Sequence, residues 1–441
     1  MADESSGRAS AFRLAGTAVI GALALAQLAS SYLRERALAT GFGATRALDM
    51  YLIALSLPQA IGLEAANAAV SLLLPRYAGA LTSSNGPPLR LFWRDLRAWS
   101  AWLGGVALLI GAAASGVAAL LGRGLTDAQR EVVARDIRLL AILVVLLGLS
   151  GVARAWLDAQ RRVWISAAMP MLRPLAIAVL VFGALHGGGP TVATVVMAAL
   201  LGAALALAIQ LLSVYHYSSH REAPAAYAPN VSRAAFQNLG ILALTALLNQ
   251  SGDFIDKSLG STTGSGQVAA LSYATMILSI PTTVLVGAFA AVALPEFARA
   301  RHQGSSGEVR SVLRRHARPL VLAMVPVVAV LVLTPRTLVA LLLGSRNLGP
   351  TGTEITAACV SALALGQIFY AASVMLRQQL LAHERYGIIL VTSASSLVVK
   401  LLASLLMIPS FGVVGLALGT TAGTTVAFAM FLSSTARLKI F

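Results

Sequence analysis

The stretch FGATRALDMYLIALSLP (Phe42–Pro58) returns 223 residues later in the chain as SGQVAALSYATMILSIP (Ser265–Pro281). With this offset, nine of the 32 positions from 27 to 58 are identical. Several of these identities are glutamine, glycine, threonine or proline, which an apolar composition alone does not bring into register. They include Gln27 with Gln250, Thr40 with Thr263, Gly41 with Gly264, Gly43 with Gly266 and Pro58 with Pro281. The repeat predicts two homologous halves, 1–222 and 223–441.

Composition places both halves in a membrane. Of the 441 residues, 57% are hydrophobic and 11% are charged, with a mean hydropathy of +0.79, whereas soluble domains carry about 25% charged residues. A bilayer span needs about 20 mainly apolar residues. Twelve stretches qualify: 14–33, 47–74, 99–121, 139–157, 165–185, 191–213, 237–259, 268–294, 319–334, 353–376, 387–408 and 413–433.

Each half therefore holds six predicted spans. Because six is even, both halves enter the membrane from the same side, and the predicted fold is an all-α polytopic membrane protein with two parallel six-helix lobes. Residues 335–344 either extend the ninth span or lie at the membrane surface. The run 14–33 lacks a small-residue cleavage site and is expected to stay in the mature protein as the first span.

The formal charge of +16 is mostly an orientation signal. Lysine and arginine concentrate in cytoplasmic loops of membrane proteins, and most of the 33 in this chain fall on one side if both termini are cytoplasmic. This predicts a multi-pass protein of the bacterial inner membrane whose surface meets membrane lipids and not nucleic acid.

Residues for enzymatic or metal chemistry are scarce. Cys359 is the only cysteine, and the six histidines lie in loops or at helix ends without ligand spacing. The chain has no G-x-x-x-x-G-K-[ST] phosphate-binding loop, and no nucleophile–base arrangement stands out. We therefore expect a protein that is not an enzyme and has no resident metal or cofactor, with Na⁺ or H⁺ as a possible coupling ion.

Two cations, Arg34 and Lys257, occupy matching positions of the repeat at the ends of spans 1 and 7. A charge at the centre of a span costs about 2.5–3.5 kcal/mol on insertion scales. We predict that these two side chains face each other across the lobe boundary and bind a pyrophosphate or phosphate. The alternative is that each extends outward to the lipid headgroups.

Other polar residues in or near the spans complete the candidate site. Those predicted to contact substrate, besides the two cations, are Gln27, Glu35, Asp49 and Gln250. Candidates for ion coupling are Glu64, Asp253 and Asp256. Arg154, Arg173 and Lys400 are expected either to reach the membrane surface or to pair within the protein.

Prolines mark equivalent places in the two halves. Pro58 and Pro281 lie inside spans 2 and 8, where a proline frees a carbonyl and permits a bend. They are the predicted hinges, with ordinary packing kinks as the alternative. Pro75 and Pro295 are expected to end the same two spans at the cytoplasmic side.

Several stretches are similar to a known family. Besides Phe42–Pro58 they are LLLPRY (Leu72–Tyr77), SGDFIDKSLG (Ser251–Gly260), GSGQVAALSYATMILSIP (Gly264–Pro281), VALPEF (Val292–Phe297), FYAASVMLRQQLLAHERYG (Phe369–Gly387) and FGVVGLALGTT (Phe411–Thr421). In this order they resemble the MurJ/MviN lipid II flippases of the MOP exporter superfamily. The resemblance implies an alternating-access carrier with a cationic central cavity that moves polyprenyl-pyrophosphate-linked sugars outward. It also implies that Arg34, Glu35 and Asp49 are polar cavity residues.

The chain departs from the family pattern in three ways. An arginine before the proline of span 8 is replaced near Met276, and an arginine pair after the proline of span 2 is replaced around Gly62–Leu63. Two further C-terminal spans, which form a groove for the lipid tail in the family, are expected to be missing. The cavity is thus less cationic, which leaves both a lipid II-type peptidoglycan precursor and an exopolysaccharide or O-antigen repeat unit as substrates.

The main hypothesis is a flippase for an undecaprenyl-pyrophosphate-linked saccharide, with enzymes of glycan synthesis as possible partners. The alternative is a cation-coupled multidrug antiporter of the same superfamily, which would use Glu64 or Asp253 as a buried carboxylate. A scaffold in a cell-envelope complex, without transport, is a third possibility.

Overall fold

The structure is a computed structural model that describes residues 2–82, 89–217, 233–302 and 306–437. These residues form α-helices with short 3-10 and π turns, and none of them lies in a strand, which confirms the predicted all-α class. Within them, nine helices are long and apolar enough to cross a membrane, and they coincide with nine of the twelve predicted spans. The other three predicted spans lie in α1, in α4 and α5, and in α9, and the total of twelve stays a prediction.

The chain divides into two compact units. Unit 1 comprises Met1–Ala37, Leu57–Ala114 and Arg135–Asn230, and unit 2 comprises Leu38–Ser56, Ser115–Ala134 and Val231–Phe441. Four helices contribute residues to both units: α1 (Ala2–Phe42), α2 (Arg46–Thr82), α3 (Leu89–Leu121) and α4 (Asp127–Leu140). The predicted lobe boundary, 222/223, lies outside the described residues and stays a prediction.

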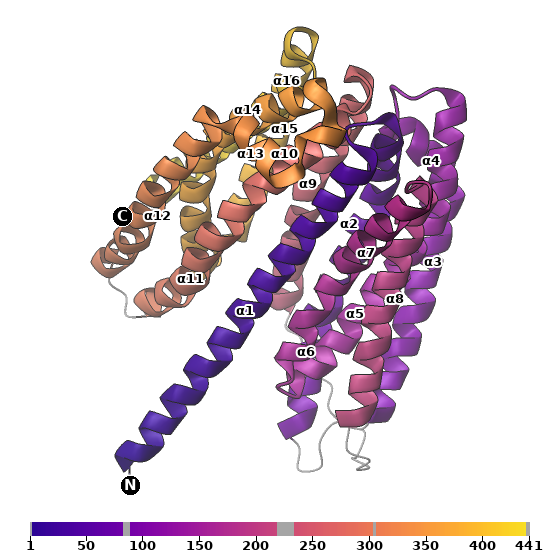
Figure 1. Cartoon of the computed structure of the whole chain (residues 1–441). Coiled ribbons are helices and arrows are strands. Elements are labelled where there is room, and N and C mark those ends of the chain that lie inside the picture. The colour runs from indigo at the N-terminus through magenta and orange to yellow at the C-terminus, as the bar shows by residue number, and fades with distance from the viewer. Residues whose placement is uncertain (1, 83–88, 218–232, 303–305, 438–441) are drawn as a thin grey trace. The chain divides into compact units, whose positions relative to one another are not determined.

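Unit 1 also contains α5 (Ile142–Ala159), α6 (Val163–Ala168), a 3-10 turn (Met169–Met171), α7 (Leu172–Ala184), a second 3-10 turn (Leu185–Gly187) and α8 (Val192–Tyr217). Helices α7 and α8 pack along each other, and α8 also packs on α5 (Figure 1). Glycines allow helices to approach closely: a Cβ on Gly202 of α8 would lie 2.6 Å from the Cα of Arg173 of α7, and one on Gly151 of α5 would lie 2.4 Å from the Cα of Ala66 of α2. Such contacts are typical of helices packed in lipid, where small residues let backbones meet.

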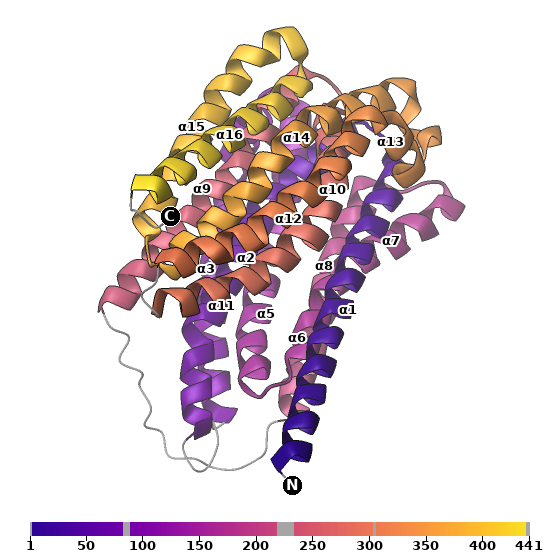
Figure 2. The same ribbon diagram turned by 90° about the vertical axis from the view of Figure 1, so that its left-hand side faces the viewer.

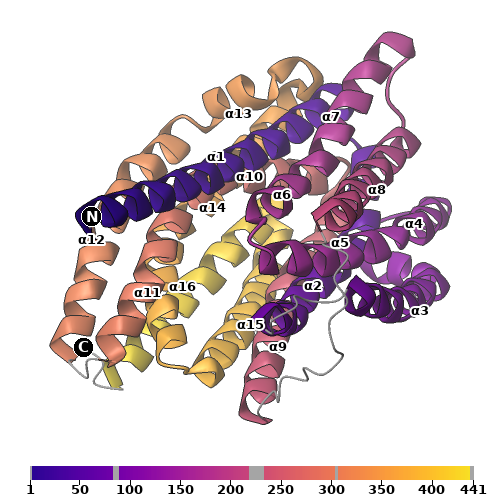
Figure 3. The same cartoon turned by 90° about the horizontal axis from the view of Figure 1, so that it is seen from below.

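Unit 2 contains α9 (Arg233–Thr263), α10 (Gln267–Pro281), a π turn (Thr282–Val286), α11 (Gly287–His302), α12 (Ser306–Leu333), α13 (Pro335–Leu343), α14 (Ser345–Ala382), α15 (Tyr386–Phe411) and α16 (Val413–Arg437). Helices α15 and α16 lie side by side (Figure 2), and α11 lies beside α12 (Figure 3). Buried side chains between α11, α12, α14 and α16 include Phe297, Met324, Met375 and Phe431. Residues 335–343 form a separate helix after a break at Thr334, so they do not extend the ninth span as one straight helix.

The four prolines differ in effect. Pro281 ends α10, and the backbone continues as a π turn in which the Thr282 hydroxyl donates to the Leu278 carbonyl at 2.7 Å; a proline commonly causes such local irregularity. Pro58 lies within an uninterrupted α2. Neither Pro75 nor Pro295 ends its helix, because α2 continues to Thr82 and α11 to His302, and the expectation that the two membrane spans end there stays a prediction.

The repeat is visible in backbone conformation. Gly43 precedes α2 with φ +62°, and its repeat partner Gly266 precedes α10 with φ +76°. Both angles lie in the left-handed region that favours glycine. Gly266 is also held tightly, because a Cβ there would lie 2.0 Å from the carbonyl oxygen of Ala44.

We expect Gly266→Ala to lower the free energy of unfolding by at least about 1–2 kcal/mol, the cost of a left-handed non-glycine residue, with the overlap at Ala44 adding to it. The measurement is the midpoint of thermal unfolding in detergent. Gly104→Ala is the control, because Gly104 lies inside α3 with no atom within 4 Å of a Cβ, and alanine favours a helix. Equal unfolding midpoints for the two variants would contradict the tightly packed, left-handed backbone at Gly266.

Candidate functional site

The two cations predicted to bind substrate each contact a carboxylate. Arg34 pairs with the buried Glu35, and Lys257 Nζ lies 2.6 Å from Asp253 Oδ1, one turn earlier in α9. Arg34 belongs to unit 1 and Lys257 to unit 2, and their shared binding site stays a prediction.

The contact of substrate with the two glutamines matched by the repeat, Gln27 and Gln250, also stays a prediction. Gln27 is exposed on α1, and Gln250 is half-buried on α9. Neither position conflicts with a polar contact to a ligand.

Asp49 is fully buried and holds the first turn of α10. Its Oδ2 accepts a hydrogen bond from the N–H of Gly266 at 2.6 Å, and its Oδ1 accepts one from the N–H of Ala269 at 2.8 Å. A helix begins with N–H groups that have no partner in the helix itself, and here a carboxylate from α2 supplies the acceptors. Arg46, on the same turn of α2, donates to the carbonyl of Ser261 at 3.2 Å. The geometry gives Asp49 a structural role that the sequence did not suggest, and its predicted contact with substrate stays a prediction.

Lys400 of α15 has a partner inside unit 2, as one of its two predicted alternatives required. Its Nζ lies 2.7 Å from Asp256 Oδ2 and donates to the carbonyl of Gly252 at 3.0 Å. Both charged side chains are largely buried. A coupling ion at Asp256 would have to displace this ammonium from the carboxylate. The ion-coupling role of Asp256 stays a prediction. Glu64, half-buried on α2, stays a prediction as well.

One histidine lies where the sequence did not place it. His316 is buried within α12, with Nε2 2.9 Å from Glu296 Oε2 on α11, so its expected position in a loop or at a helix end is wrong. The sequence suggested otherwise because α12 extends well before the apolar run that begins at residue 319. Within the described part of the chain, no three His, Cys, Asp or Glu residues are grouped closely enough to hold a metal ion.

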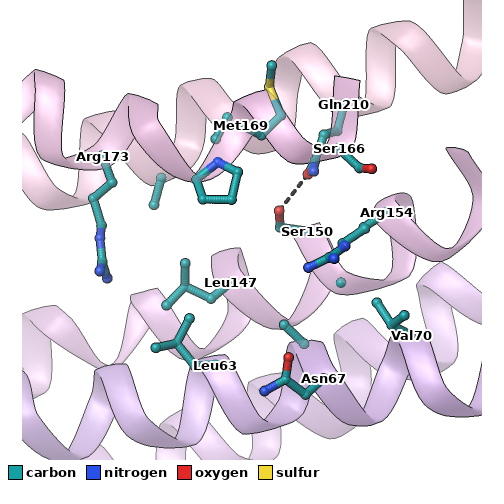
Figure 4. Close-up of a pocket in the computed structure, with 15 residues that line it drawn as sticks. Leu63, Asn67, Val70, Leu147, Ser150, Arg154, Ser166, Met169, Arg173 and Gln210 are labelled. Carbon is teal, nitrogen blue, oxygen red and sulfur yellow. Dashed lines mark hydrogen bonds between the residues drawn. The ribbon is translucent and has the colours of Figure 1, made fainter. Parts of the chain in front are cut away.

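A cavity of about 130 Å³, with a mostly apolar lining, lies within unit 1 between α2, α5, α6, α7 and α8 (Figure 4). Its polar lining consists of Asn67, Ser150, Arg154, Ser166, Arg173 and Gln210. Arg154 and Arg173 were candidates for the membrane surface or for internal pairing, and the structure brings them to one cavity. Arg154 lies near the end of α5 and Arg173 near the start of α7, and the reversal of the chain through α6 brings both to the cavity.

Hydrogen bonds fix the walls of this cavity. Ser150 donates to Gln210 Oε1 at 2.5 Å, which ties α5 to α8. Ser166 donates to Asp158, and Arg154 Nε lies 3.4 Å from the other oxygen of that carboxylate. The serine and the carboxylate thus hold Arg154 at the cavity.

A second cavity, of about 350 Å³, lies within unit 2 between α10, α14 and α16. Its lining carries hydroxyl and amide groups and no charged side chain: Thr275, Ser279, Thr282, Gln367, Tyr370, Thr420, Thr421 and Thr424. Thr282 Oγ1 lies 3.1 Å from Gln367 Oε1, and Thr421 donates to the carbonyl of Ala362 at 2.7 Å. The two units therefore enclose cavities of different charge.

We expect Asp49→Ala to destabilise the protein markedly. It removes the acceptors of two buried N–H groups, and a buried donor left without a partner costs about 1–3 kcal/mol. Asp49→Asn keeps one side-chain carbonyl oxygen and should lose less. Thermal unfolding of the purified variants tests this order, and an alanine variant as stable as the wild type would refute the capping role.

Lys400→Met should lower the free energy of unfolding by about 3–5 kcal/mol, because it leaves Asp256 as a buried charge without its partner. Adding Asp256→Asn should recover part of the loss in a double-mutant cycle. Lys257→Met is the matched control, since Lys257 is as buried as Lys400 but leaves behind Asp253, which is 49% exposed and can be solvated, so a smaller loss is expected. Equal losses in the two lysine variants would contradict a buried Lys400–Asp256 pair.

Comparisons with known proteins agree with this architecture. A solved structure of "Lipid II flippase MurJ, inward closed conformation" matches with a TM-score of 0.80 at 14% identity, over 95% of this chain and 87% of that one. An inward-facing multidrug resistance MATE family transporter of the MOP superfamily matches with a TM-score of 0.70 at 15% identity, over 94% and 98%. An outward-facing transporter of the same family gives 0.62 at 16% identity, over 95% of each chain. These likenesses concern the fold.

No curated protein matches the chain by sequence. A family model does: the one described as "Lipid II flippase MurJ" matches residues 38–441. That match confirms the resemblance found in the sequence and covers most of this multi-pass membrane protein. The chain belongs to the lipid II flippase MurJ family, a family of transporters.

Proposed function

We propose that this protein is an alternating-access flippase that moves an undecaprenyl-pyrophosphate-linked saccharide from the inner to the outer leaflet of the bacterial cytoplasmic membrane. The saccharide is a lipid II-type peptidoglycan precursor or an exopolysaccharide or O-antigen repeat unit. The family match across residues 38–441 carries the proposal.

The physical task is to take an anionic headgroup through hydrocarbon. Each charge at the bilayer centre costs several kcal/mol unless the protein compensates it. Cations on membrane helices provide that compensation, and Arg34, Lys257, Arg154 and Arg173 are such cations. Translocation then needs no covalent chemistry, so we propose a transporter without enzymatic activity.

The proposal also includes the orientation of the protein in the membrane, the ion that drives transport and the hinges. The arginine-rich loops favour both termini in the cytoplasm, and synthesis of the substrate on that side would make glycan-synthesis enzymes natural partners. Na⁺ or H⁺ is the proposed coupling ion, with Glu64 and Asp253 as the carboxylates that could bind it. Pro281, beside its π turn, and Pro58 are the proposed hinges.

A multidrug antiporter would need a carboxylate in an apolar pocket. Neither Glu64 nor Asp253 lines the cavity of unit 1 or the neutral cavity of unit 2. The fold shared with MATE transporters leaves this as the alternative. Efflux of organic cations from vesicles, without movement of lipid-linked saccharide, would favour it.

In reconstituted vesicles, we expect the double variant Arg34→Ala, Lys257→Ala to reduce translocation of lipid II at least about tenfold, because a hydrogen bond to a charged group contributes about 1.5–3 kcal/mol. Arg36→Ala is the matched control: Arg36 is exposed on the same helix and donates to the Tyr32 hydroxyl at 3.2 Å. Unfolding midpoints check that both variants fold.

Unchanged translocation by the double variant would refute the assignment of these two cations. Wild-type protein that moves no lipid-linked saccharide and fails to rescue a flippase-depleted strain would refute the function itself.

A further inference from the structure

We infer that the cavity of unit 1 is a binding site for a phosphate or diphosphate group, with Arg154 and Arg173 as its cationic ligands. The inference rests on the proposed function and adds to it a position where the headgroup is held within one unit. No role in substrate binding followed for these two residues from the sequence.

Charge is the first argument. Two guanidinium groups line the cavity, and none of its lining residues is acidic. The carboxylate in contact with Arg154, that of Asp158, lies 3.4 Å away and also accepts a hydrogen bond from Ser166. The cavity therefore has a positive potential that an anion would complement.

Direction is the second argument. Figure 4 shows the Arg154 guanidinium pointing into the space among Ser150, Leu147 and Asn67, and the Arg173 guanidinium at the other end of the cavity. Asn67 of α2 and Gln210 of α8 face the same space. Guanidinium groups bind phosphate oxygens in pairs of hydrogen bonds, and the amide of Asn67 can donate to a further oxygen.

The cavity is large enough for a phosphate group. On this measure a cavity needs about 10–15 Å³ to hold one water molecule, so a cavity of about 130 Å³ holds several waters or a phosphate group in their place.

Position suggests when binding occurs. Arg154 lies near the end of α5, and Arg173 is the second residue of α7, so both flank residues 160–171, which the arginine distribution places on the cytoplasmic side. A phosphate approaching from the inner leaflet would meet this cavity early. Arg162 in the same segment is engaged elsewhere, with its guanidinium 4.4 Å from the centre of the Tyr217 ring.

A phosphate at this site has two possible sources, the diphosphate of a polyprenyl-linked substrate and the headgroup of an anionic phospholipid. We assign it to the substrate diphosphate. The two sources differ in the lipid that carries them, so a binding experiment separates them.

The test uses the full-length protein in nanodiscs of phosphatidylcholine and the arginine reagent phenylglyoxal, with peptide mass spectrometry to measure modification. Inorganic pyrophosphate and, separately, undecaprenyl diphosphate should slow modification of Arg154 and Arg173 at least about fivefold, by occupying the cavity. Modification of Arg162 should change by less than about twofold. This comparison needs no variant and is therefore independent of folding.

Calorimetric titration with pyrophosphate supplies the second measurement. Arg154→Gln with Arg173→Gln should weaken binding at least about tenfold, whereas Arg162→Gln should leave it within about twofold. Equal modification with and without pyrophosphate, or equal affinity in the double variant, would overturn the site. Phosphatidylglycerol, added to the nanodiscs in a separate protection experiment, represents the phospholipid source. Protection by phosphatidylglycerol but not by undecaprenyl diphosphate would overturn the assignment of the bound phosphate to the substrate.

These outcomes are separable from failure of the proposed function. Translocation without protection of Arg154 and Arg173 refutes the site alone. Protection by undecaprenyl diphosphate without translocation refutes the function and leaves the site standing.

Discussion

Backbone hydrogen bonding at the start of α10 is the constraint on which the structure of unit 2 depends. A buried backbone N–H has no water to bind, so it must be satisfied within the protein. Gly266 has no side chain with which to cap its own helix, and its left-handed backbone favours glycine at this position. Asp49 supplies both acceptors from 217 residues earlier in the chain. The segment Leu38–Ser56 consequently belongs to the same compact unit as the C-terminal helices.

Further contacts reinforce this junction within unit 2. The Tyr273 hydroxyl donates to the carbonyl of Gly43 at 3.0 Å, and the N–H of Gly124 donates to Ser261 Oγ at 3.1 Å. A Cβ on Gly124 would lie 2.0 Å from the carbonyl oxygen of Ser261. Segments from both halves of the sequence thus meet at backbone distance, which explains why a compact unit does not coincide with a sequence half.

Hydrophobic length was sufficient to predict the nine long apolar helices among the described residues, because a membrane span is a local property of the sequence. The repeat also marked Gly43 and Gly266, which share a left-handed conformation. The partners of the buried charged residues could not be predicted from hydrophobic length or from the repeat. Asp256 and Lys400 are 144 residues apart, and the partner of a buried ion depends on which helices pack together. The cavity of unit 1 was missed for the same reason, since nothing local relates Arg154 to Arg173.

The cavities of the two units differ in the charge of their lining residues, although the halves of the sequence are related. In unit 2 the ammonium of Lys400 contacts a carboxylate, and the polar cavity is neutral. In unit 1 two guanidinium groups share a cavity without an acidic lining residue. Arg154 also contacts a carboxylate, that of Asp158, which does not itself line the cavity. With two cationic lining residues and no acidic one, the arrangement favours a ligand that carries negative charge, and a phosphate on a lipid carrier is such a ligand.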